Sequence, residues 1–298
     1  MENIVKIVGK LYSHDLEFKQ DDNGRNLVRG SFGILVDEKT KQTEKIEVYI
    51  YEKTKKDSVN KTYSLLNKIV QNQNNFYETN KSTALQVRAQ CNMTLNPYYV
   101  KQGDNFELRE PKRNRLVFLN EDAVTPMGAA FSLECDISAI TERVDENGMP
   151  TNEADLTVKY YDEYAGTMSF KLRVDNPDYL AIIQTNFIQG QPNLMKLGGK
   201  IVDLVIGKEV AQETAFGVNT VSTSSRNVKT YLVDSGQFLV ADEKFEELKI
   251  KCDQKRQEKL AEAKDRAAKK EQEQGKTKTT NVGFGTAQMS GLGSDFKF

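Results

Sequence analysis

The sequence predicts a mainly β protein: two tandem five-stranded modules, each with a helix between its third and fourth strands, followed by a charged helix and a flexible tail. Three observations support this fold class. Short apolar runs are bounded by turn residues, which is typical of strands. The same order of runs recurs from about residue 130, which indicates an internal repeat. After residue 240 the composition becomes highly charged, which marks the end of the second module.

The first module is expected at 1–122. It begins with an apolar run that contains Val5 and Leu11, and a turn at 22–24 (Asp-Asn-Gly) follows. Its expected elements are strands at 5–11, 28–36 and 46–51, a helix at 62–70, and strands at 85–95 and 116–119. A break at 120–128, which contains Pro126 and Gly128, ends the module.

The second module is expected at 129–240 and repeats this order, with a turn at 146–148 (Glu-Asn-Gly). Its expected elements are strands at 131–140, 156–161 and 168–174, a helix at 179–187, and strands at 201–206 and 228–233. Three strands, one helix and two strands is the element order of the OB fold, a small five-stranded barrel that often holds oligonucleotides. The sequence therefore predicts two OB-like barrels in tandem.

Two further segments follow the modules. Residues 242–274 consist mostly of charged residues, Gln and Ala, with opposite charges four positions apart, as at Glu247 and Lys251. An apolar stripe of Phe245, Leu248 and Cys252 near its start predicts that this helix docks on the second module there. Residues 275–298 are rich in Gly, Ser and Thr, and we expect a flexible, disordered tail.

Composition narrows the function classes. The formal net charge is −1, so any binding of nucleic acid must come from local basic patches. The three cysteines, Cys91, Cys135 and Cys252, are far apart and form no CxxC pair, which predicts neither a zinc site nor a disulfide framework. The start shows no signal-peptide pattern, and no apolar run approaches the ~20 residues that cross a bilayer. We therefore expect a cytoplasmic protein that makes no contact with membranes.

No catalytic constellation is found. The single histidine, His14, lies beside Asp15 near a turn, and such a residue is far more often a solvated loop residue than a catalyst. The motifs of serine hydrolases, nucleotide-binding loops, zinc proteases and dinucleotide-binding folds are missing from the sequence. We expect a protein that is not an enzyme and needs no metal or cofactor.

The third strand of the first module carries the first candidate site. Alternation places Ile46, Val48 and Ile50 inside the barrel, so Tyr49 and Tyr51 point outward. Two rings on the outer face of such a barrel can stack on unpaired bases, at roughly 1–3 kcal/mol per base. The alternative is that both rings are covered by the helix or by the second module. The lysines that follow the strand are candidates for phosphate contacts: Lys53, Lys55 and Lys56.

Two further candidate sets follow from the same reasoning. In the second module, the outward positions of the second and third strands hold one aromatic and three cationic residues: Lys159, Tyr161, Lys171 and Arg173. This mixture suits a single-strand groove, and the alternative is a solvated strand face. The loops between the fourth and fifth strands, which border the groove of OB folds, hold Tyr98, Tyr99, Arg109, Lys112, Arg113 and Arg115 in the first module, and Arg226 and Lys229 in the second.

By element order over residues 1–240, the chain resembles the tandem OB-fold single-stranded-DNA-binding proteins of large bacteriophages. The resemblance implies sequence-tolerant binding of single-stranded DNA during phage DNA replication and recombination, in the host cytoplasm. It also implies a C-terminal tail that recruits replication or recombination proteins, here through Phe296 and Phe298. The tip departs from the usual acidic pattern, because Asp295 is its only acid and Lys297 is cationic.

A second function is compatible with the same sequence. The chain could be a non-enzymatic phage structural or adaptor protein that uses its barrels as assembly modules, since a fold does not dictate a function. The near-neutral net charge and the long charged helix favour this alternative.

Overall fold

The computed structural model describes residues 1–103, 105–145, 147–213 and 219–279, with the side chains of 205–227 and 272–279 outside that description. Within these residues the chain forms thirteen β-strands, three α-helices and a 3-10 turn at Gln73–Asn75. The prediction of a mainly β protein with a C-terminal helix is confirmed. None of the described helices combines the length and the apolar character needed to cross a membrane.

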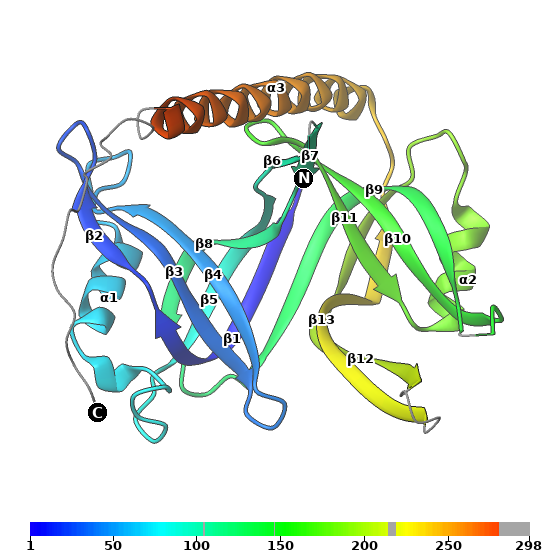
Figure 1. Cartoon of the computed structure of the whole chain (residues 1–298), viewed down its shortest axis with the longest axis horizontal. Helices are drawn as coiled ribbons and strands as arrows, with labels where there is room; N and C mark the ends of the chain where they lie inside the picture. Colours follow the sequence, from blue (N-terminus) through cyan, green and yellow to red (C-terminus); the bar gives the residue numbers. More distant parts are fainter. Residues whose placement is uncertain (104, 146, 214–218, 280–298) are drawn as a thin grey trace, which may run out of the picture. The chain divides into compact units, whose positions relative to one another are not determined.

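Five strands of the first 121 residues form a closed ring, which we call the first ring (Figure 1). Its members are β1 (Asn3–His14), β3 (Asn26–Asp37), β4 (Gln42–Tyr51), β8 (Lys112–Glu121) and β5 (Gln86–Leu95). Neighbours pair antiparallel in that order, except that β4 and β8 are parallel and β5 returns to β1. The short β2 (Glu17–Gln20) extends β3 at its outer edge. The ring is therefore a closed five-stranded barrel.

The alternation expected for β4 is observed. Ile46, Val48 and Ile50 are buried in the core, and Tyr49 is exposed. After β4 the chain enters α1 (Lys61–Val70). Asn60 caps this helix, because its side chain accepts a hydrogen bond from the backbone N–H of Thr62. Leu66 and Ile69 of α1 pack into the core.

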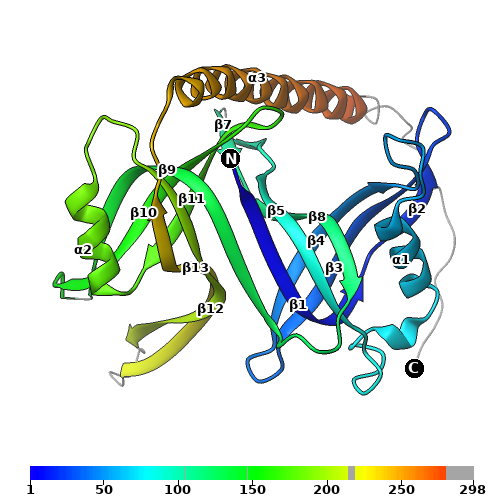
Figure 2. The same ribbon diagram turned by 180° about the vertical axis from the view of Figure 1, so that it is seen from behind.

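Five later strands form a second ring with the same pairing pattern (Figure 2). Its members are β9 (Gly128–Val144), β10 (Pro150–Asp162), β11 (Gly166–Val174), β13 (Asn219–Phe238) and β12 (Leu194–Glu213). All neighbours are antiparallel except β11 and β13, which pair in parallel at Arg173 and Leu232. Helix α2 (Pro177–Asn186) follows β11, with Leu180 and Ile183 buried.

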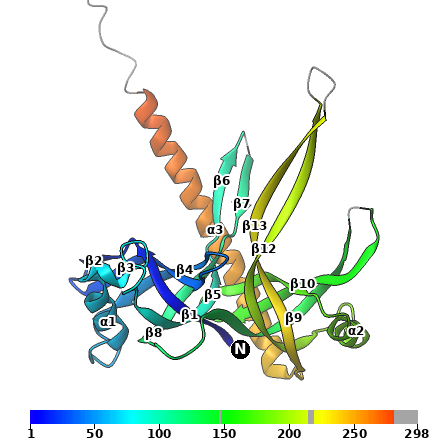
Figure 3. The same ribbon diagram turned by 90° about the horizontal axis from the view of Figure 1, so that it is seen from below.

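The last two strands of the second ring are longer than the sequence predicted. β12 pairs with β9 only from Leu194 to Lys200, whereas its pairing with β13 continues to Glu213 and Asn219. Beyond the ring the two strands therefore continue as a two-stranded ribbon (Figure 3). The sequence predicted only 201–206 and 228–233, because the ribbon is polar and lacks the apolar alternation of a half-buried strand.

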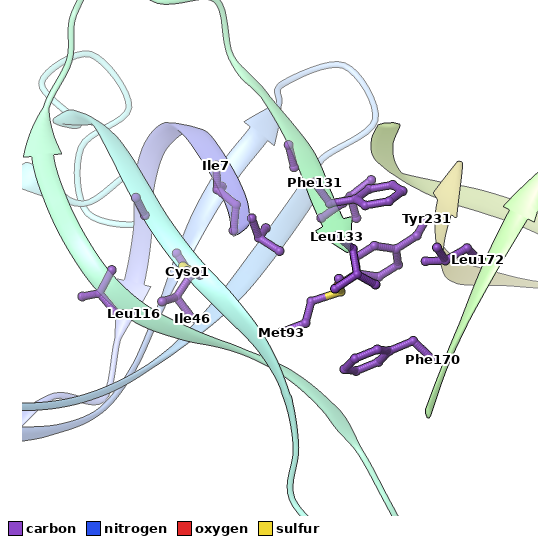
Figure 4. Close-up of a cluster of buried hydrophobic side chains, with 14 of the residues drawn as sticks. Ile7, Ile46, Cys91, Met93, Leu116, Phe131, Leu133, Phe170, Leu172 and Tyr231 are labelled. Atoms are coloured by element: carbon purple, nitrogen blue, oxygen red, sulfur yellow. The ribbon is translucent and has the colours of Figure 1, made fainter. Parts of the chain in front are cut away.

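The two rings share one sheet and one core. The first half of β1 pairs with β9, from Asn3 opposite Leu133 to Val8 opposite Gly128. The buried side chains of both rings form a single cluster, in which Met93 of β5 gathers with Leu133, Tyr231 and Phe170 (Figure 4). The buried Asn3 side chain strengthens this region, because it donates to the carbonyl of Met93 at 2.8 Å and accepts from its N–H at 2.9 Å.

Two more elements complete the fold. A hairpin of β6 (Tyr98–Gln102) and β7 (Asn105–Arg109) occupies the loop between β5 and β8. Helix α3 spans Glu243–Thr279. The chain divides into two compact units: the rings with the start of α3 up to Gln257, and the hairpin with the rest of α3 from Glu258. In the second unit, Lys101 of β6 pairs with Glu271 of α3.

The start of α3 docks on the second ring, as its apolar stripe predicted. Phe245 packs edge-on against Tyr161 of β10, with ring centroids 5.4 Å apart. Cys252 is fully buried in the same small cluster, and Leu248 packs against it. Gly166, at the start of β11, has a φ of +82° and lies directly against the α3 backbone at Arg256. A residue without a side chain is required there on both counts.

Candidate nucleic-acid interface

Two tyrosines on the outer side of β4 form the centre of the candidate interface. The rings of Tyr49 and Tyr51 are perpendicular, with centroids 5.7 Å apart, and their hydroxyl groups are 3.2 Å apart. Tyr49 is 45% exposed, so part of its side chain is open to a ligand. The hydrogen bond with Tyr49 raises the pKa of Tyr51 to about 12, so the Tyr51 hydroxyl keeps its proton at physiological pH.

The second tyrosine is held by neighbours from the β2–β3 turn. The guanidinium of Arg25 lies 4.5 Å from the centroid of the Tyr51 ring and pairs with Asp21 at 2.7 Å. The hydrogen bond from Arg25 lowers the pKa of Asp21 to about 2. Because Arg25 covers one face of the Tyr51 ring, that face is not free to stack on a base, and Tyr51 borders the site instead. Beside it lies a hollow of about 610 Å³, lined by Arg25, Tyr51, Lys53 and Lys55 among others.

Cationic side chains from β8 flank the tyrosines. The parallel pairing of β4 with β8 sets Glu47 opposite Arg115 and so places the outward residues of both strands side by side. The Arg115 guanidinium lies 6.0 Å from the Tyr49 ring centroid, and Arg113 pairs with Glu47. We call this surface the β4–β8 face, formed by Lys45, Tyr49, Tyr51, Arg113 and Arg115. It combines an exposed ring with cations, which is what stacking on bases and pairing with phosphates require.

A second hollow, of about 320 Å³, lies where β13 meets β4 and β8, and we call it the junction pocket. Lys112 and Lys229, both predicted site residues, line it together with Glu44, Lys45, Arg113 and Tyr231. The Lys112 ammonium is 3.8 Å from the Tyr231 ring centroid, and Lys229 pairs with the fully buried Glu44 at 2.7 Å. Burial lowers the pKa of Lys112 to about 8. Sequence reasoning did not include Lys45, although its outward position in β4 marks it as a candidate.

Tyr161 lies on the outer side of β10, as alternation predicted, but the structure contradicts its expected exposure to a ligand. This residue is 2% exposed, its hydroxyl donates to Asp136 at 3.2 Å, and its ring contacts Phe245. The physical reason is that α3 covers the outer side of β10, so a residue on that side is buried beneath a helix. Burial also raises the pKa of Tyr161. It therefore offers no stacking surface.

The other predicted site residues on β10 and β11 are cationic side chains that differ in their exposure. Arg173 is only 13% exposed in its side chain, because it lies against Asp155 at 3.4 Å. Lys159 is half-buried, and Lys171 is exposed. Without Tyr161 these residues do not reproduce the aromatic and cationic combination of the β4–β8 face.

Other predicted residues are placed elsewhere or are not described. Lys53 pairs with Asp57 at 2.9 Å, whereas Lys55 and Lys56 are exposed. In the hairpin, Tyr98 is exposed, Tyr99 is half-buried, and Arg109 pairs with Glu107 at 2.9 Å. The hairpin belongs to the second compact unit. The side chain of Arg226 and the tail residues Phe296 and Phe298 lie outside the described residues.

The closed first ring, with its parallel β4–β8 pair, has the strand pairing of an OB-like barrel. The chain belongs to the YorF family, whose model matches residues 2–266. No curated protein sequence matches it. Among solved structures, it is similar to the wild-type single-stranded DNA binding protein from Thermus aquaticus, at 8% identity and a TM-score of 0.46, over 81% of this chain and 94% of that chain. A deletion mutant of the same protein gives 9% identity and a TM-score of 0.44, over 81% and 96% of the two chains.

Proposed function

We propose that this protein binds single-stranded DNA without strong sequence preference, and that its two rings are tandem OB-like barrels. The observation that carries the proposal is the exposed ring of Tyr49, flanked by Arg115 on β8 and by the Tyr51–Arg25 pair. A base stacked on such a ring gains roughly 1–3 kcal/mol whatever its identity, because every base has a π-face.

The charge distribution supports binding at this face despite the net charge of −1. Most acids near the face are already paired, as Glu47 is with Arg113 and Asp21 is with Arg25. Arg115 and Lys45 remain exposed for phosphate contacts. Each of these ion pairs is neutral as a whole, so Arg115 and Lys45 leave a local excess of positive charge on this face of a nearly neutral chain.

The wider role is also a proposal. We place the protein in phage DNA replication or recombination as a non-enzymatic, cytoplasmic binding protein, with its tail recruiting partner proteins through Phe296 and Phe298. The support for this role is the resemblance of element order and of the Gly-rich, Phe-ended tail described above.

Fluorescence anisotropy with single-stranded and duplex oligonucleotides, at two salt concentrations, tests the proposal. We expect preference for the single strand and an affinity that falls with salt. Tyr49→Ala should weaken binding by about 5- to 150-fold, which is the loss of one stacked base. Tyr164→Ala is the matched control, because Tyr164 is a tyrosine 81% exposed in the β10–β11 turn. Equal affinity of both variants and the wild type would place binding elsewhere.

The structural or adaptor function is the second candidate. Helix α3 favours it, because a helix of 37 residues that is mostly charged is suited to docking a partner. Absence of oligonucleotide binding at low salt, with a correctly folded protein, would decide for this function.

A further inference from the structure

The junction pocket is an open hollow next to the β4–β8 face that is lined by several cationic side chains. Three lysines and one arginine reach it from three strands: Lys45 from β4, Lys112 and Arg113 from β8, and Lys229 from β13. β4 and β8 belong to the first ring and β13 to the second, so the pocket is built by both rings.

The acids near the pocket leave part of this charge unmatched. Glu44 is fully buried and pairs with Lys229, and Glu47 pairs with Arg113. Lys112 forms no ion pair with any described residue, and its ammonium instead lies over two rings, 3.8 Å from the centroid of Tyr231 and 5.7 Å from that of Phe170. The contacts with the two rings stabilise this half-buried cation only in part, and the acid in the pocket, Glu44, is already paired with Lys229, so an added anion should bind favourably beside Lys112.

Glu44 is the acid in the lining of the pocket, and it pairs with Lys229 at 2.7 Å. One of its carboxylate oxygens, Oε2, is buried and has no hydrogen-bond partner among the described residues. A backbone phosphate has no hydrogen to donate to this oxygen, so the binding of phosphate in the pocket of about 320 Å³ must come from the cationic side chains.

We propose that the junction pocket binds a backbone phosphate of the single strand, with the Lys112 ammonium as its main ligand and Lys45 as the second. The proposal rests on the proposed function, since it extends the path of a strand from the β4–β8 face toward the second ring. Lys45 belongs to both the face and the pocket, which makes that path continuous.

Salt dependence and proton uptake test the pocket directly. Lys112→Met should lower the steepness of log affinity against log salt by about 0.7, the value of one phosphate contact on a single strand. Lys112 has a pKa of about 8 in the free protein, and a bound phosphate favours its charged form. Calorimetry at pH 9 in two buffers of different ionisation enthalpy should therefore show uptake of close to one proton by the wild type, and correspondingly less by Lys112→Met.

The proton uptake has to be assigned to Lys112 rather than to the other side chains around it. They are Glu44 and Lys45 on β4, Arg113 on β8, Phe170 on β11, and Lys229 and Tyr231 on β13. Burial raises the pKa of Tyr231 far above the range of the experiment. Lys112→Arg is the conservative variant, because arginine stays charged at pH 9. It should keep the salt dependence and lose the proton uptake.

Failure of the proposed function and failure of the phosphate site give different results. If the wild type binds no oligonucleotide at low salt, the proposed function fails. If it binds, but Lys112→Met keeps the wild-type salt dependence and proton uptake, the pocket does not bind the strand. A third experiment adds inorganic phosphate alone and measures the stability of the protein. Stabilisation of the wild type by phosphate, together with an unchanged salt dependence in Lys112→Met, would identify a site for free phosphate and would overturn the proposal.

Discussion

Replacing Gly166 by alanine should loosen the docked start of α3. Gly166 has a φ of +82°, and an L-residue in that conformation costs roughly 1–2 kcal/mol. A Cβ at this position would lie 2.7 Å from the backbone N of Arg256 and 3.0 Å from the carbonyl oxygen of Cys252. Both atoms belong to the helix backbone, so the helix must move, and overpacking of this kind costs roughly 1–3 kcal/mol. The expected total is roughly 2–5 kcal/mol.

Gly148 provides the matched control. Its φ is +80°, and a Cβ there would have no atom within 4 Å, so Gly148→Ala carries only the backbone cost of roughly 1–2 kcal/mol. Urea denaturation measures the two losses of stability, and hydrogen exchange of residues 243–257 reports on the helix. We expect faster exchange of that segment only in Gly166→Ala. Equal destabilisation by the two variants, with unchanged exchange of the segment, would refute the reasoning.

Three further predictions concern other contacts. Tyr49→Phe removes the hydrogen bond that raises the Tyr51 pKa, so ultraviolet titration should show that pKa falling from about 12 toward the ordinary value near 10. Tyr161→Ala should destabilise the fold by roughly 3–5 kcal/mol, as for other buried aromatic residues, while the folded fraction keeps its affinity for oligonucleotides; a loss of affinity without loss of stability would contradict its buried position. Asn3→Ala leaves the backbone groups of Met93 without that partner and should cost roughly 2–4 kcal/mol in urea denaturation, whereas a neutral result would show that water replaces the amide.

The first ring could be predicted from the sequence because each of its strands has one buried side. The alternation of Ile46, Val48 and Ile50 reports a core on one side of β4, and it also places Tyr49 on the other side. The neighbours of Tyr49 were harder to predict from the sequence. The contact with Arg115 depends on the register of the parallel β4–β8 pair, for which the sequence has no local signal.

Tyr161 shows the limit of the same reasoning. Alternation tells which side of a strand a residue occupies, but not what covers that side. Here α3, more than 80 residues later, covers the outer side of β10 with Phe245. The apolar stripe of α3 correctly predicted docking on the second ring. Its docking surface had to be apolar as well, and the ring of Tyr161 meets that requirement.

The hairpin of β6 and β7 was missed for a different reason. Its strands are short and only half-buried, so alternation over 98–109 is weak. Gly103, with a φ of +60°, lies at its turn and is a local signal for a hairpin. The junction pocket could not be predicted, since it brings Lys112 and Tyr231 together from strands that are far apart in the sequence.

The β1–β9 ladder has a consequence for how a long ligand would be held. Many proteins with repeated binding modules join them by flexible linkers, and their avidity then depends on linker length. Here the backbone of Asn3–Val8 in β1 is hydrogen-bonded to β9, so the two rings are held together without a flexible linker between them. The occluded length of a polynucleotide should accordingly be constant rather than adjustable. A fragment cut between the modules would expose a bare strand edge on each half, and such edges recruit other chains.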